Sequence, residues 1–189
     1  GLSAGGPSAL QFALRHSQRC SGLLMVSAVS KAMIDVAFNP KVMKTLTSSL
    51  LASEWLIWFG LQLAIKKMVP PFGVPMRVIQ KIDDQDSAWL QTLLEYVLPI
   101  KPRRAGVVND YLQIMQLDIY PLAQIKTPTL VIHAQDDSLV SIQQGRYSAK
   151  NIPHARLVEL PSGGHLMLGQ RERTRAEVEP FLQEITRTP

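Results

Sequence analysis

One serine near the start of the chain sits in a pattern that suits nucleophilic chemistry. Gly1-Leu2-Ser3-Ala4-Gly5 has the spacing G-x-S-x-G, which places a serine on a sharp strand-to-helix turn with its hydroxyl above the sheet. We expect the residues two before and two after Ser3 to be small, because the chain packs on itself at such a turn. The N–H of Ala4 would point from the start of the helix toward a developing oxyanion.

A serine hydroxyl needs an adjacent base before it can attack efficiently. Among the four histidines, His165 is the best candidate, because it follows Ser162-Gly163-Gly164 in a loop directly after an apolar stretch. Such a loop can bring an imidazole to the edge of a sheet. The others are expected away from that role: His16 late in a helix, His133 in a strand as a structural hydrogen-bonding group, and His154 in a turn beside a proline.

The base in turn needs a carboxylate that fixes its tautomer. Asp136 and Asp137 follow an apolar, β-branched run, Thr129 to Ala134, at the edge where α/β sheets place catalytic groups. From position alone, either carboxylate could turn toward His165. The order serine, aspartate, histidine along the chain is one of the known orders of such a triad.

The elements that must hold these residues alternate between helix and strand at both ends of the chain. Helices are expected over 7–16, 143–149 and 174–186, and strands over 23–28, 129–134 and 155–160. Alternation of this kind predicts parallel pairing and an α/β fold. The short, continuously apolar run at 23–28 is typical of a strand buried on both faces of a parallel sheet.

Residues 31–120 differ in composition and periodicity from the segments on either side. They are rich in Met, Leu, Gln and Trp, have helical periodicity, and are interrupted by prolines at 40, 70–75 and 99–102. The sequence therefore predicts three parts: a core segment 1–30 with the serine turn, a helical insertion 31–120 of four or five helices, and a core segment 121–189 with the acid and histidine loops.

Two further segments, together with the serine pattern, resemble the α/β-hydrolase fold superfamily. PTLVIHAQDDSLV is similar to its strand-H-G-x-x-D-x-x-V segment, and PSGGHLMLGQ is similar to its G-G-H segment. On this match Asp137 rather than Asp136 takes the place of the acid, Val140 the apolar position after it, and Ala134 stands where glycine is usual. The fold also allows an acid after the preceding strand, where Asp35 is the candidate.

The resemblance implies a lidded serine esterase or lipase-like enzyme, with 31–120 as its lid. Ser3 would be the nucleophile, His165 the base and Asp137 the acid, with Ala4 in the oxyanion hole. The substrate would be a small apolar ester-like molecule, and no metal or organic cofactor would be needed. Carbon–carbon hydrolysis, amidase and haloperoxidase reactions use the same triad, and a hydrolase-like protein that only binds a small ligand is an alternative.

The resemblance covers the fold only from its serine turn onward, so we expect a partial fold that lacks its N-terminal strands. About 80–130 further residues would complete a domain of this kind and supply a second oxyanion donor. Without them, the 23–28 strand would have an unpaired edge, and the isolated chain would be an inactive or unstable fragment.

Composition excludes several other classes of protein. The chain has 189 residues, of which 46% are hydrophobic and 19% charged, which excludes a disordered protein. Its one cysteine, Cys20, excludes an intrachain disulfide and a Cys-rich zinc site and is expected to be structural. The 20 basic and 15 acidic residues give a net charge of +5, but the basic residues form no stripe, so no nucleic-acid partner is expected.

No secretory signal is visible, which favours a cytoplasmic location. Nothing in the sequence indicates the oligomeric state.

One stretch of the insertion, Leu46 to Ile65, is long and apolar enough to raise the question of a membrane span. Because it contains Glu54, Gln62 and three serines, we interpret it as part of the lid, with no stable span. Its large apolar residues are expected to pack against the core; the alternative is that they line an acyl pocket. These residues are Trp55, Trp58, Phe59, Leu61 and Leu63.

Overall fold

Within the residues that the structure describes, three parallel strands form one sheet. The computed structural model describes residues 1–33, 55, 58–59, 66, 69–99 and 101–187. The strands are β1 (Leu23–Val26), β2 (Thr129–Ala134) and β3 (Arg156–Leu160), in the order β1-β2-β3. Leu24 lies opposite Leu130, and Val131 opposite Leu157, so both pairs run parallel as the alternation of elements predicts.

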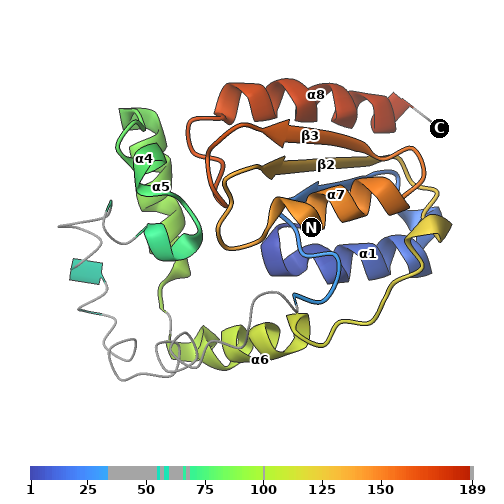
Figure 1. Cartoon of the computed structure of the whole chain (residues 1–189), viewed down its shortest axis with the longest axis horizontal. Coiled ribbons are helices and arrows are strands. Elements are labelled where there is room, and N and C mark those ends of the chain that lie inside the picture. The colour runs from blue at the N-terminus through green and yellow to red at the C-terminus, as the bar shows by residue number, and fades with distance from the viewer. Residues whose placement is uncertain (34–54, 56–57, 60–65, 67–68, 100, 188–189) are drawn as a thin grey trace.

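Helices cover both faces of this sheet (Figure 1). α1 (Gly6–Arg15) and α7 (Ile142–Asn151) lie on one face, where Leu10 and Ala13 of α1 are buried against Met25 and Val131. α8 (Arg171–Arg187) covers the other face, with Phe181 among the buried side chains. The central strand β2 is buried along its whole length, as expected for a strand between two helical layers. The predicted α/β fold is confirmed.

The observed bounds differ from the predicted ones by a few residues. The strand predicted over 23–28 ends at Val26, because Ser27 adopts a positive φ of 44° that turns the chain out of the sheet. α1 begins at Gly6 with a proline in its first turn, where no N–H is needed. α8 begins at Arg171, about one turn before the predicted start. Short 3-10 turns lie at Ser3–Gly5, Ser17–Arg19 and Leu122–Gln124.

The inserted helices follow β1 in the chain and precede β2. Those with described bounds are α4 (Met76–Ile79), α5 (Asp84–Val97) and α6 (Arg104–Ile114), with 3-10 turns at Pro70–Phe72 and Lys101–Arg103. A second apolar cluster, which includes Val78, Ile79 and Leu90, packs α4 and α5 against Leu166 and Leu168 of the loop after β3. The described residues of 31–120 contain no strand. That this segment is a separate lid remains a prediction.

Three large aromatic residues of the insertion do not behave as the sequence predicts. Trp55, Trp58 and Phe59 are 73%, 44% and 47% exposed, so the expectation that they are buried against the core is wrong. Their rings contact one another instead, with centroids 5.9 and 6.4 Å from that of Trp55. Leu61, Leu63 and Asp35 lie outside the described residues, as does most of the stretch 46–65. Within the described residues, no helix has the length and apolarity that a bilayer crossing requires.

The outer edge of β1 is partly paired. The Val26 N–H donates to the carbonyl oxygen of Gly1 at 2.9 Å, and Leu2 forms an isolated parallel bridge with Val26. The nitrogen of Gly1 also donates to the Leu24 carbonyl oxygen at 2.7 Å. β1 is thus an edge strand as predicted, but its outer edge is not left entirely open, because Gly1 and Leu2 lie alongside it.

Candidate active site

Ser3 lies at a sharp turn between this edge pairing and α1. Its φ is +50°, in the left-handed region that side chains other than glycine rarely adopt, and such strain is often found at functional sites. The turn is held in place by neighbouring backbone. The Ser3 carbonyl oxygen accepts from the Val29 N–H at 3.0 Å, and the Gly5 N–H donates to the Leu2 carbonyl oxygen at 2.8 Å.

Two glycines make this turn possible, but they are not the two that the pattern singles out. A Cβ on Gly1 would lie 2.9 Å from the Cβ of Ala9, so a small residue is needed there as predicted. A Cβ on Gly5 would meet nothing within 4 Å, so the prediction is wrong for that position. Instead Gly6 is the constrained residue, since its Cβ would lie 2.0 Å from the Val29 carbonyl oxygen. The start of α1 crosses the chain after β1 at Gly6.

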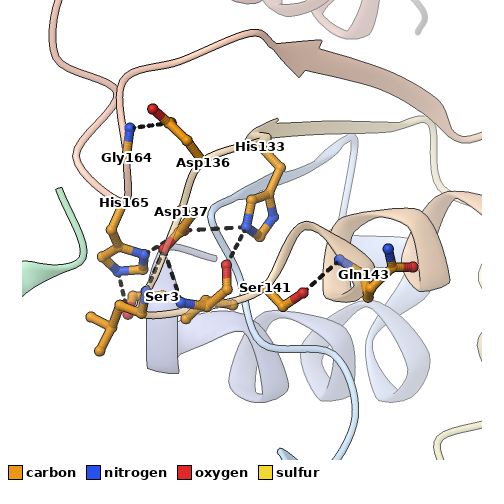
Figure 2. Close-up of polar contacts among 10 residues, drawn as sticks. Ser3, His133, Asp136, Asp137, Ser141, Gln143, Gly164 and His165 are labelled. Carbon is orange, nitrogen blue, oxygen red and sulfur yellow. Dashed lines mark hydrogen bonds and ion pairs between the residues drawn. The ribbon is translucent and has the colours of Figure 1, made fainter. Parts of the chain in front are cut away.

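His165 comes within hydrogen-bonding distance of both other predicted triad residues (Figure 2). Its Nε2 atom lies 2.9 Å from Ser3 Oγ, and its Nδ1 atom lies 2.8 Å from Asp137 Oδ2. The residue is 5% exposed and sits in the loop after β3. A carboxylate can only accept, so the ring carries its proton on Nδ1, and Nε2 is left to accept the Ser3 hydroxyl proton.

Asp137 is the carboxylate that faces His165. Its Oδ1 atom accepts from the N–H groups of Leu139 and Val140, each at 2.9 Å, which fixes the side chain in the loop after β2. Burial by itself would raise the pKa of Asp137. Hydrogen bonds from His133 and His165, with the Val140 N–H, outweigh this and hold the pKa below its usual value. Asp136, the alternative left open by position, turns away to Gly164 and Arg77.

His133 is a member of this cluster that the sequence did not reveal in full. It is fully buried in β2, and its Nε2 atom lies 2.8 Å from the Val140 carbonyl oxygen and 3.2 Å from Asp137 Oδ2. Both neighbours are acceptors, so Nε2 carries a proton and donates to them. The predicted hydrogen-bonding role fits this contact. The contact between His133 and Asp137 could have been anticipated from their spacing, because His133 lies near the end of β2 and Asp137 follows four residues later in the loop.

The remaining candidates lie elsewhere. His16 follows the last residue of α1 and is exposed, and His154 lies in an exposed turn. Cys20 is half-buried beside the Gly22 carbonyl oxygen. Within the described ranges, no three His, Cys, Asp or Glu side chains form a group that could hold a metal ion.

A small apolar cavity of about 120 Å³ opens beside Ser3 and Ala4. The Ala4 N–H belongs to the first helical turn, where the helix itself offers no acceptor, so it is suited to an external oxygen. The cavity is lined mostly by aliphatic side chains from the chain after β1, α6 and the acid loop. They include Val29, Met33, Ile114, Met115, Leu139 and Val140, with Tyr111.

Comparisons with known proteins agree with this arrangement. Residues 1–172 match the profile of a family described as alpha/beta hydrolase fold. The chain is 26% identical over 194 residues to a poly(3-hydroxyalkanoate) depolymerase of Ectopseudomonas oleovorans, covering 97% of this chain and 60% of that protein. It is 25% identical over 185 residues to the uncharacterized hydrolase YcgS of Bacillus subtilis (strain 168), covering 88% of this chain and 60% of that protein.

A solved structure supports the same grouping. The alpha/beta hydrolase fold protein from Nakamurella multipartita superposes with a TM-score of 0.76 at 26% identity, covering 94% of this chain and 65% of that one. The chain thus spans 60–65% of the length of these three proteins.

Proposed function

Because the chain belongs to the alpha/beta hydrolase fold family, we propose that the protein is a serine hydrolase that cleaves a carboxylic ester of a small apolar substrate. The observation that carries the proposal is the continuous path from Ser3 Oγ through His165 to Asp137, with distances of 2.9 and 2.8 Å. These are hydrogen-bond distances suited to a nucleophile, its base and the group that orients the base.

In the first half of the reaction, His165 Nε2 takes the proton as Ser3 Oγ bonds to the ester carbon. The carbonyl oxygen becomes an oxyanion, toward which the Ala4 N–H can donate. Collapse of this intermediate breaks the bond to the alcohol oxygen, and His165 returns the proton to the departing alkoxide. The product is an acyl group on Ser3 and a free alcohol.

In the second half, water replaces the alcohol. His165 takes a proton from the water as it attacks the acyl carbon, and then gives the proton to Ser3 Oγ as the acid leaves. Throughout, Asp137 keeps the Nδ1 proton of His165 in place and stabilises the imidazolium that forms twice per cycle. The lowered pKa of Asp137 supports this role, since it favours the ionised carboxylate that accepts the Nδ1–H of His165.

The cavity beside Ser3 supports a small apolar substrate. Its volume of about 120 Å³ is below the roughly 150 Å³ of an engineered apolar cavity that holds benzene. We propose that it takes a short acyl or alcohol chain and that the inserted helices form the lid over it. α6 supports the lid role, since Tyr111 and Ile114 line the cavity.

The test is covalent labelling with a fluorophosphonate, together with hydrolysis of p-nitrophenyl acetate and butyrate. Ser3→Ala should abolish labelling and turnover. Ser8→Ala, on the exposed side of α1 five residues later, is the matched control and should behave as the unmodified protein does. Labelling that survives Ser3→Ala would contradict the proposal. Ligand uptake without any Ser3-dependent labelling would favour the binding protein instead.

A further inference from the structure

Asp136 ties the histidine loop to the acid loop next to the triad. Its Oδ1 atom accepts from the Gly164 N–H at 2.8 Å, and its Oδ2 atom pairs with Nη2 of Arg77 at 3.2 Å. The Asp136 side chain is 7% exposed, whereas that of Arg77 is 69% exposed. Figure 2 shows Asp136 and Asp137 pointing to opposite ends of the same short stretch, Gly164 and His165.

The backbone at Gly164 determines where the His165 ring starts. Gly163 and Gly164 have φ values of +127° and +60°, so this loop adopts a conformation that other residues rarely hold. A Cβ on Gly164 would lie 2.6 Å from the Cα of Val74, which shows how closely the loop packs against the segment before α4. A charged acceptor for the Gly164 N–H therefore fixes the residue directly before the base.

A second contact fixes the backbone of His165 itself. The Gly73 carbonyl oxygen accepts from the His165 N–H at 3.0 Å and from the Ser138 N–H at 3.3 Å. The acid loop, the histidine loop and the segment leading into α4 thus meet at two points, the N–H groups of Gly164 and His165, which lie on either side of the Gly164 Cα. Asp136 supplies the side-chain half of this junction, and Gly73 supplies the backbone half.

We propose that Asp136 is a positioning residue: it holds the Gly164 peptide so that the imidazole of His165 stays aligned between Ser3 and Asp137. Both carboxylate oxygens of Asp136 are bonded to Gly164 and Arg77, so we assign it no part in proton transfer. The inference rests on the proposed function, because it assumes that His165 is the base.

The chain offers a closely matched control for a test. Asp86, also buried, accepts from the Gly169 N–H at 2.7 Å and pairs with Nη2 of Arg171 at 3.2 Å. It therefore makes the same two kinds of bond as Asp136, to the same loop, but four residues beyond His165. Removing either carboxylate deletes one bond to a backbone N–H and one bond to an arginine.

Kinetics on four variants separate positioning from general stability. Asp136→Ala should lower kcat about 10–100-fold with KM within about 3-fold, because a misaligned base slows chemistry without weakening binding. Asp136→Asn keeps an oxygen for the Gly164 N–H and should recover kcat to within about 5-fold. Arg77→Ala leaves that bond intact and should also stay within about 5-fold, as should Asp86→Ala despite a similar loss of stability.

A spectroscopic measurement tests the alignment without relying on turnover. The Nδ1 proton of His165, bonded to Asp137, is expected far downfield in the proton spectrum of ¹⁵N-histidine-labelled protein, and His165→Ala assigns it. The resonance should broaden or shift in Asp136→Ala and stay in place in Asp86→Ala.

An unchanged resonance and kcat in Asp136→Ala, or equal losses in Asp136→Ala and Asp86→Ala, would overturn the inference. A protein that shows the expected change in resonance but no Ser3-dependent labelling would overturn the proposed function alone.

Discussion

His133 Nε2 lies 3.2 Å from Oδ2 of Asp137, the same oxygen that accepts from His165 Nδ1 at 2.8 Å. The carboxylate is therefore held between two imidazoles, one buried in β2 and one in the histidine loop. Since both rings donate to it, this pairing explains how a buried carboxyl keeps its pKa below the usual value although burial opposes ionisation.

Replacing the buried imidazole should be costly. We expect His133→Phe to lower the free energy of unfolding by about 1–3 kcal/mol, because it removes the imidazole N–H bonded to the buried Val140 carbonyl oxygen and one of the donors to Asp137. Urea denaturation measures this loss. His133→Gln, which keeps a side-chain N–H, should recover part of it, and His16→Phe on the surface should change stability by no more than about 0.5 kcal/mol. Equal stability of His133→Phe and the unmodified protein would contradict the pairing.

An added methyl group should affect the stability of the protein very differently at the two glycines that follow Ala4. Gly5→Ala should change the free energy of unfolding by less than about 1 kcal/mol, since the new Cβ meets no atom within 4 Å. Gly6→Ala should cost about 3 kcal/mol, because its Cβ would lie 2.0 Å from a backbone oxygen that cannot move aside. Thermal and urea unfolding of the two variants measure these free energies. Similar stabilities of Gly5→Ala and Gly6→Ala would contradict the close approach of Gly6 to the Val29 carbonyl oxygen.

The apolar cavity should set the preferred acyl length. Met33 is 7% exposed and lines the cavity, so Met33→Ala enlarges it. We expect kcat/KM for hexanoyl and octanoyl esters to rise relative to acetyl esters by about 10-fold, the scale on which hydrophobic pockets discriminate methylene groups. Met76→Ala removes an exposed methionine of α4 and is the control. An unchanged chain-length profile in Met33→Ala would place the acyl group elsewhere.

Acid stability should depend on Glu159. Hydrogen bonds from Arg146, and then from Gln135, lower the pKa of Glu159 from 4.5 to about 2. Because the folded value lies below the unfolded one, its contribution is fully present above about pH 4.5 and is lost as the pH falls through about 2. The free energy of unfolding should therefore fall less steeply between these values in Glu159→Gln than in the unmodified protein. Glu177→Gln, at a looser pair 3.7 Å from Arg156, should leave the slope nearly unchanged.

Sequence reasoning went furthest where the signal is local and periodic. The run from Thr129 to Ala134 and the loops after β2 and β3 were predictable, because apolar β-branched residues and glycines act through their own backbone. The juxtaposition of Ser3, Asp137 and His165 followed from a general property of parallel sheets: loops at the carboxyl ends of neighbouring strands share one edge.

What escaped prediction depends on how elements cross. Whether Gly5 or Gly6 must be small is set by where α1 meets the chain after β1, and no local pattern encodes that crossing. The partners of Asp136 lie in a different loop and in α4, so its role could not be distinguished from that of Asp137 by position. The exposure of Trp55 likewise could not be predicted, because the apolar residues around it in the sequence do not indicate which side chains face solvent.

The separation of Ser3 and His165 along the chain has a consequence for the timing of assembly. These two side chains are 162 residues apart, so they meet only after nearly all of this segment has been made. At about 5–20 residues per second, the ribosome adds the histidine roughly 8–30 s after the serine. For that interval the His165 ring, which the proposed function makes the base, is not available to the Ser3 hydroxyl. On the proposed function, the serine would therefore become a nucleophile only after the loop that follows β3 has been made.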